Sequence, residues 1–168
     1  MDPLPPRGLL IVWWSGTGGS EALARAAFSG ASLARATPVR MLAAPDAGPG
    51  DLAAAAGLLI VTPEMLGSMA GRMKDLFDRC YYPLLEKLAG RPCALIVCAG
   101  SDGTGAVRQI ERILTGWRMR RVDAPMIVIT GAQTPEAIAA PKQIGTEPLS
   151  RAFALGQALA EGIAMGVW

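Results

Sequence analysis

Short, continuous apolar runs that alternate with amphipathic segments are the feature that most limits how this chain can fold. Four runs are dense in Ile, Val and Leu, and Gly, Pro or Ser follows each of them closely: residues 9–14, 58–62, 93–98 and 125–130. Continuous runs of this length are typical of strands that are buried on both faces, as in a parallel sheet. A fifth run at residues 38–42 has mixed polarity and predicts an edge strand.

The segments between these runs carry apolar residues at helical spacing. Five of them are expected to be helical: residues 20–35, 51–56, 71–88, 104–117 and 147–163. Pro83 falls inside the third segment and is expected to interrupt it. Residues 132–146 are the one long stretch that is expected to be irregular.

This alternation predicts an α/β fold with a five-stranded parallel sheet in the doubly wound order 2-1-3-4-5 and helices on both faces. The length of 168 residues predicts a single domain over residues 1–168. In such folds a ligand lies beyond the carboxyl ends of the strands, near the switch in strand order. The loops after the first, third and fourth strands meet there.

The composition argues against several classes of protein. Apolar residues make up 51% of the chain and charged residues 18%, so a disordered chain is not expected. The net charge of +2 is too small and too scattered for a nucleic-acid partner. No apolar run approaches the ~20 residues of a membrane span, and none near the N-terminus is long enough for a signal peptide. We therefore expect a cytoplasmic protein that binds neither nucleic acid nor membrane.

The chain has no histidine and three cysteines, Cys80, Cys93 and Cys98, without CxxC spacing. A zinc site that contains histidine and a Ser-His or Cys-His catalytic pair are therefore excluded, and no metal site is expected. Three cysteines do not make a disulfide framework, and we expect buried, reduced thiols.

The loop after the first strand, residues 14–21, reads WSGTGGSE. Its glycines allow a tight turn, and the helix that follows offers unpaired N–H groups and the positive end of its dipole. The hydroxyls of Ser15, Thr17 and Ser20 add donors. This combination predicts a phosphate cradle that needs no Lys or Arg, and an ordinary strand-to-helix turn is the alternative. The loop matches neither the nucleoside-triphosphate loop nor the GxGxxG dinucleotide motif.

The pattern Ser15-x-Thr17-Gly18-x-Ser20 resembles the phosphate loop of flavodoxins, [ST]-x-T-G-x-[ST], and it lies at the expected place after the first strand. The resemblance implies a three-layer, flavodoxin-like fold. It also implies that the 5′-phosphate of FMN is held by Ser15, Thr17, Gly18, Gly19 and Ser20.

The loop after the third strand looks like that of the NAD(P)H-dependent FMN reductase branch of this superfamily, which has Pro-Glu-Tyr-x-Gly-Ser-x-x-Gly-x-x-Lys. This chain keeps Pro63, Glu64, Gly67, Ser68, Gly71 and Lys74. The resemblance implies that Leu66, Gly67 and Ser68 line the flavin ring, with backbone N–H groups near its reactive nitrogen. It also places Pro63, Glu64 and Met65 among the FMN-binding residues. Met65 replaces the tyrosine of the family, which leaves ring stacking and the substrate side open. A connecting loop with exposed methionines is the alternative.

The loop after the fourth strand is rich in glycine, and its small residues let the backbone approach a ligand closely. Flavodoxin-like proteins wrap the ring edge and the ribityl chain with this loop. The resemblance therefore adds Ala99, Gly100, Ser101, Asp102 and Gly103 to the FMN-binding residues. Asp102 is expected either to accept a hydrogen bond from a ribityl hydroxyl or to cap the next helix.

The resemblance implies an enzyme, an NAD(P)H-dependent FMN reductase that passes electrons to a quinone, a flavin or another small acceptor. The flavin does the chemistry, and no catalytic side chain is required. One alternative is a flavodoxin-type electron carrier that docks on redox proteins. The weakly positive net charge of this chain argues against that alternative. A flavodoxin-fold protein with a weak or lost flavin site is the other alternative. A homodimer or homotetramer that shares the flavin site is compatible with the resemblance.

Overall fold

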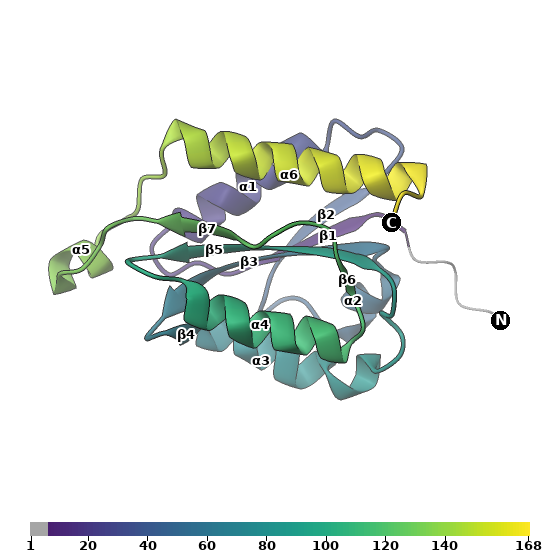
Figure 1. Ribbon diagram of the computed structural model, residues 1–168, viewed down its shortest axis with the longest axis horizontal. Coiled ribbons are helices and arrows are strands. Elements are labelled where there is room, and N and C mark those ends of the chain that lie inside the picture. Colours follow the sequence, from purple (N-terminus) through teal and green to yellow (C-terminus); the bar gives the residue numbers. More distant parts are fainter. Residues whose placement is uncertain (1–6) are drawn as a thin grey trace.

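A parallel sheet lies at the centre of the computed structural model, which describes residues 7–168 (Figure 1). Its strands are β1 (Leu9–Trp13), β2 (Val39–Ala43), β3 (Gly57–Met65), β5 (Pro92–Ala99), β6 (Arg120–Arg121) and β7 (Met126–Ile129). They follow the order β2-β1-β3-β5, and both β6 and β7 pair with β5. The predicted order 2-1-3-4-5 is confirmed, because β6 and β7 share the fifth position. The predicted domain also includes residues 1–6, which lie outside the described part of the chain.

The fifth strand is divided because its middle does not pair with β5. The Asp123 carboxylate accepts a hydrogen bond from the N–H of Ala124 at 2.8 Å, so this N–H is not given to the sheet. Pro125 follows and has no N–H to give to a ladder. The sequence analysis found β7 but not β6, since a pair of exposed arginines carries no strand pattern.

Helices cover both faces of the sheet, as predicted. Their bounds are α1 (Gly19–Ala31), α2 (Pro49–Ala54), α3 (Gly71–Cys80), α4 (Thr104–Gly116), α5 (Pro135–Ala139) and α6 (Thr146–Met165). Figure 1 shows α1 and α6 on one face and α3 and α4 on the other. Leu52 of α2 packs in the same core as α3 and α4.

Two expectations about the helices have different outcomes. Pro83 interrupts the third predicted helix as expected: α3 ends at Cys80, and a short 3-10 helix, η1 (Tyr82–Leu84), follows. The segment 132–146 is not wholly irregular, because it contains α5. Pro135 begins that helix with a φ already suited to it, and the Thr134 hydroxyl caps it by accepting the N–H of Ala137 at 3.2 Å.

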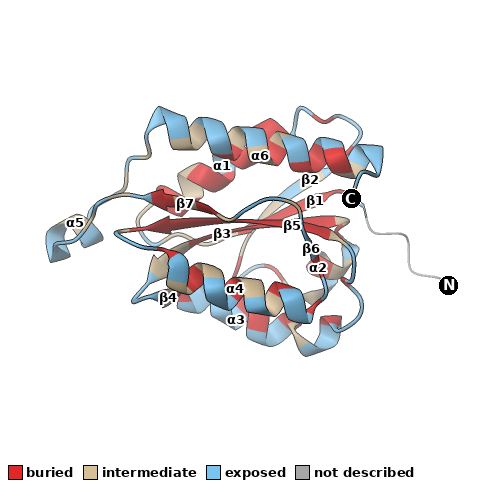
Figure 2. Ribbon diagram, viewed as in Figure 1, coloured by how far each residue is buried: buried red, intermediate tan, exposed pale blue. Residues whose placement is uncertain are grey.

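The central strands are buried on both faces, as the apolar runs predicted (Figure 2). All residues of β5 are buried. In β1, Leu10 and Val12 face the core under α2, α3 and α4, whereas Leu9 and Ile11 face the core under α1 and α6. β2 is only partly buried, in agreement with its predicted place at the edge.

Two glycines bring α1 and α6 into backbone contact. A Cβ on Gly30 would lie 2.0 Å from the carbonyl oxygen of Phe153, and one on Gly156 would lie 2.0 Å from that of Ala27. No other residue fits at these crossings without separating the helices. The close contact fixes α1, and with it the loop that precedes α1.

Within residues 7–168, no helix has the length and apolar character needed to cross a membrane.

Candidate functional site

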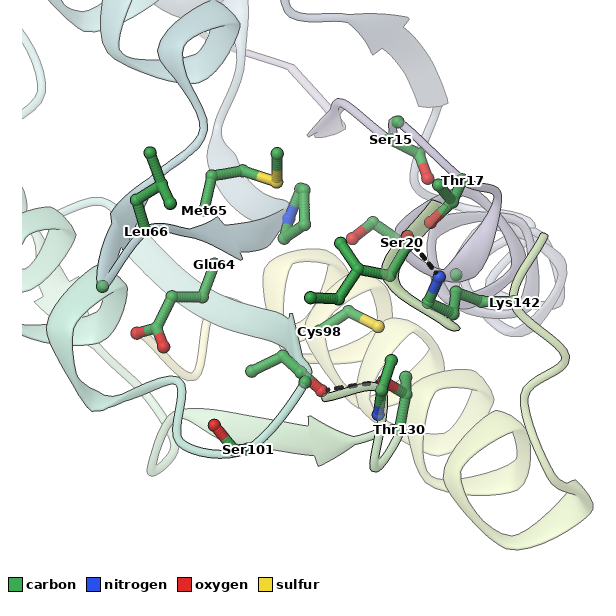
Figure 3. A pocket seen from close by; sticks show the side chains of 18 residues that line it. Ser15, Thr17, Ser20, Glu64, Met65, Leu66, Cys98, Ser101, Thr130 and Lys142 are labelled. Carbon is green, nitrogen blue, oxygen red and sulfur yellow. Dashed lines mark hydrogen bonds between the residues drawn. The ribbon is translucent and has the colours of Figure 1, made fainter. Parts of the chain in front are cut away.

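A cavity of about 360 Å³ opens at the carboxyl ends of β1, β3 and β5, within the usual range of about 300–1,000 Å³ for small-molecule sites. The three predicted loops meet around it (Figure 3). Most of the predicted site residues line it: Ser15, Thr17, Gly19, Ser20, Pro63, Glu64, Met65, Leu66, Gly67, Ala99, Gly100 and Ser101. Gly18, Ser68, Asp102 and Gly103 do not.

One end of the cavity is formed by the loop after β1 and the start of α1. Gly18 has a φ of 91°, a conformation that favours glycine, and its N–H donates to the Ser15 hydroxyl oxygen at 2.9 Å. No side chain caps α1, so the first N–H groups of the helix keep their capacity to bind a ligand. Figure 3 shows Ser15, Thr17 and Ser20 together at this end.

Ser20 carries the clearest sign of a binding site. The residue is 1% exposed and lines the cavity, and its hydroxyl has no hydrogen-bond partner among residues 7–168. A buried hydroxyl without a partner costs about 1–3 kcal/mol, so such groups are rare and need an explanation. A bound acceptor at the start of α1 would supply the partner, and a phosphate fits this donor set.

The other end of the cavity is a hairpin that the sequence analysis did not anticipate. β3 runs on to Met65 and pairs antiparallel with β4 (Ser68–Met69). Leu66 and Gly67 form the turn, with φ angles of 53° and 70°. A leucine in this region costs about 1–2 kcal/mol, and the Leu66 side chain is fully exposed at 104%. Strain and an exposed apolar side chain at a cavity mouth are typical of a functional position.

Glu64 lines the cavity, but both of its carboxylate oxygens are engaged elsewhere. They accept the N–H of Gly103 at 2.9 Å and the N–H of Ala106 at 3.1 Å. Glu64 therefore caps α4 from a distance and joins the hairpin to that helix. A Cβ on Gly105 would lie 2.0 Å from the Gly67 carbonyl oxygen, so the hairpin and α4 are in backbone contact.

Three predicted residues outside the cavity have other partners. The Ser68 hydroxyl donates to the Gln109 side chain on α4 at 2.8 Å. The Asp102 carboxylate accepts the Thr104 hydroxyl at 2.8 Å. Gly103 is buried with a φ of 90°, and a Cβ there would meet Ile127 at 2.7 Å. Gly18, the fourth residue outside the cavity, shapes the turn beside it. A direct role of these residues toward FMN stays a prediction.

Part of the wall was not predicted from the sequence: Gly16, Cys98, Thr130, Ala132, Ile138 and Lys142. Several of these come from the segment after β7, which crosses to the first loop: the N–H of Lys142 donates to the Thr17 carbonyl at 2.7 Å. Nothing in the sequence predicts this long-range bond. The one available signal was that Lys142 is the only cation in residues 132–146.

Cys98 forms the floor of the cavity as a neutral thiol. Burial raises the pKa of Cys98 above its usual value, and the positive charge of Lys142 offsets this only in part. A Cβ on Gly19 would lie 2.9 Å from the Cys98 sulfur, so glycine is needed where α1 begins over this floor.

Comparison with solved structures agrees with the flavodoxin-like fold. A flavodoxin from the domain Archaea has a TM-score of 0.73 at 18% identity, covering 93% of this chain and 98% of that one. A WrbA-like flavodoxin from Agrobacterium tumefaciens has a TM-score of 0.66 at 15% identity, covering 95% and 98%. The Flv1 flavodiiron core from Synechocystis sp. PCC6803 has a TM-score of 0.77 at 13% identity, with 97% of this chain matching 37% of that one. At these identities the similarity shows the fold.

A search of curated protein sequences finds no match to this chain. A sequence model described as NADPH-dependent FMN reductase matches residues 50–134. That match spans half of the chain and includes the hairpin, α3, β5 and α4. The chain therefore belongs to the NADPH-dependent FMN reductase family.

Proposed function

We propose that this cavity binds FMN and that the protein is an NAD(P)H-dependent reductase that passes electrons to a quinone, a flavin or another small acceptor. The unpartnered Ser20 hydroxyl at the uncapped start of α1 is the observation that carries the proposal. It supports a phosphate site at the start of α1, and family membership supports the identity of the ligand.

The two ends of the cavity give the ligand a direction. The loop after β1 offers hydroxyls and backbone N–H groups to an anion, whereas the hairpin at Met65 and Leu66 offers apolar surface to a ring. Gly100 and Ser101 line the cavity between β5 and α4, where small side chains leave room for a chain of hydroxyls. In this orientation the phosphate lies at Ser20 and the flavin ring lies beside the hairpin.

Bound FMN supplies the redox chemistry, since its ring takes up a hydride and releases electrons to an acceptor. The residues of this chain bind and orient it. The hairpin is braced by Glu64, whose oxygens are held by N–H groups of α4. Cys98 is buried and its thiol pKa is raised, so it contributes neutral surface and not a nucleophile.

A flavodoxin-type electron carrier is the second candidate, and one observation favours it. Leu66, Ile129 and Ile138 are exposed large apolar side chains from three segments at the carboxyl end of the sheet. Exposed apolar side chains of this kind suit contact with another protein as well as with a small apolar acceptor.

FMN titration of the purified apo-protein, followed by flavin fluorescence, tests the proposal. We expect saturable quenching at one FMN per chain, and then NAD(P)H oxidation by the loaded protein with a quinone or free flavin as acceptor. FMN binding without NAD(P)H oxidation would favour the carrier. Absence of binding at high micromolar FMN would refute both candidates.

A further inference from the structure

Lys142 is the positively charged side chain among the described residues that line the cavity. Glu64 is the other charged residue in the wall, and the two lie at opposite sides of the cavity (Figure 3). Figure 3 places Lys142 beside Ser20 and Thr17. The cavity therefore has an electrostatic direction, with the cation at the end where α1 begins.

The ammonium group of Lys142 is held in place by the end of α5. It donates to the carbonyl oxygens of Ala137 and Ile138 at 2.8 Å each and to that of Ala140 at 2.6 Å. These three bonds use all three donors of the group. None of the ion pairs among residues 7–168 includes Lys142. Its charge is thus fixed in position and is not neutralised by a carboxylate.

The stem of Lys142 packs directly against the start of α1. A Cβ on Gly19 would lie 3.2 Å from the Cβ of Lys142, and the main chain of Lys142 is bonded to Thr17. Lys142 and Cys98 both line the cavity, and the lysine charge offsets part of the rise that burial causes in the pKa of the Cys98 thiol. The uncapped start of α1, the buried Ser20 hydroxyl and the stem of Lys142 therefore lie at the same end of the cavity.

We infer that Lys142 makes the cavity selective for a phosphorylated flavin over riboflavin, acting as a fixed counter-charge and not as a hydrogen-bond donor. The loop after β1 offers only neutral donors, whereas a phosphate monoester carries close to two negative charges at neutral pH. A cation beside the loop offsets part of that charge. This inference rests on the proposed function, since it concerns the same cavity and the same ligand.

The test compares the dissociation constants of FMN and riboflavin for the wild type, Lys142→Met, Lys142→Arg and Lys87→Met. Lys87 is exposed, lies between η1 and β5 at the other end of the sheet, and its loss changes the net charge equally. We expect Lys142→Met to weaken FMN binding about tenfold or more, as for loss of a partly screened charge pair, with riboflavin binding changed less than about twofold. Lys142→Arg should restore part of the preference, and Lys87→Met should match the wild type.

A purely structural role of Lys142 would change the two dissociation constants in a different way. If it only held α5 in place, both flavins would bind more weakly by the same factor, and the inference would be overturned. An unchanged FMN affinity in Lys142→Met would also overturn it. Failure of the wild type to bind either flavin would instead refute the proposed function, on which the inference rests.

A measurement on the wild type alone keeps the inference falsifiable if Lys142→Met does not fold. Salt screens a fixed charge but hardly affects neutral contacts. The preference for FMN over riboflavin should therefore decrease as the ionic strength rises from about 0.05 to 0.5 M. A preference that does not vary with salt would contradict the role of the charge.

Discussion

Ser20→Ala should stabilise the apo-protein and weaken FMN binding at the same time. The Ser20 hydroxyl is buried without a partner, which costs about 1–3 kcal/mol in the apo-protein. Alanine removes that cost and leaves a gap of only one oxygen atom. We therefore expect the free energy of unfolding to rise by about 1 kcal/mol, or Tm by about 2–4 °C. A hydrogen bond to a charged group contributes about 1.5–3 kcal/mol, so the Kd for FMN should rise about 10- to 100-fold.

Urea unfolding of the apo-protein and FMN fluorescence titration measure the two effects separately. Ser29→Ala is the matched control, because Ser29 lies on the same helix, is exposed, and donates to the Arg25 carbonyl at 3.0 Å. It should change both quantities little, by less than about 0.5 kcal/mol. If Ser20→Ala lowers the stability of the apo-protein, the hydroxyl has a partner in the fold. If FMN affinity stays within twofold, the phosphate lies elsewhere.

Three further predictions concern the scaffold of the site. Glu64→Gln should lower the free energy of unfolding by about 1–3 kcal/mol, because an amide cannot accept both N–H groups at the start of α4, whereas Glu161→Gln on the exposed face of α6 should not. Burial raises the pKa of Cys93 to about 12, so above pH 9 the unfolded chain loses this proton before the folded one does. Above pH 9 the free energy of unfolding of the wild type should then fall, relative to that of Cys93→Val, by up to about 1.4 kcal/mol per pH unit. Urea unfolding at several pH values measures this, and an equal pH dependence of the two proteins would contradict it. Gly156→Ala should destabilise by about 1–3 kcal/mol through contact with α1, whereas Gly50→Ala, where a Cβ meets open space, should be neutral or slightly stabilising.

The strands and their order were predictable because strands that are buried on both faces require continuous apolar runs in the sequence. Residues 93–98 form the centre of β5 and are apolar throughout, and they are buried throughout. The interruption of the third helix at Pro83 was equally predictable, since the proline ring and its missing N–H cannot continue a helix. These features depend on local chemistry alone, and so a single sequence contains them.

The parts of the site that were missed depend on contacts between distant segments. Lys142 reaches the cavity through its backbone bond to Thr17, which no local pattern records. The Ser68 hydroxyl donates to Gln109 on the neighbouring helix, an orientation that the motif does not give, and its contact with the flavin stays a prediction. A motif locates a loop in the sequence, whereas the direction of each side chain depends on the helix that packs against it.

The two glycine-rich loops show why this difference matters for function. Gly18 precedes α1 and Gly103 precedes α4, with nearly the same φ of 91° and 90°. Either helix start could hold a phosphate if the sequence were the only guide. At α4 the carboxylate of Glu64 already occupies the first N–H groups, so an anion there would meet a negative charge. At α1 no side chain caps the helix, the hydroxyl of Ser20 has no partner, and a cation lies alongside. The occupancy of the helix start, and not the glycine content of its loop, therefore supports the proposal that a phosphate binds at the start of α1.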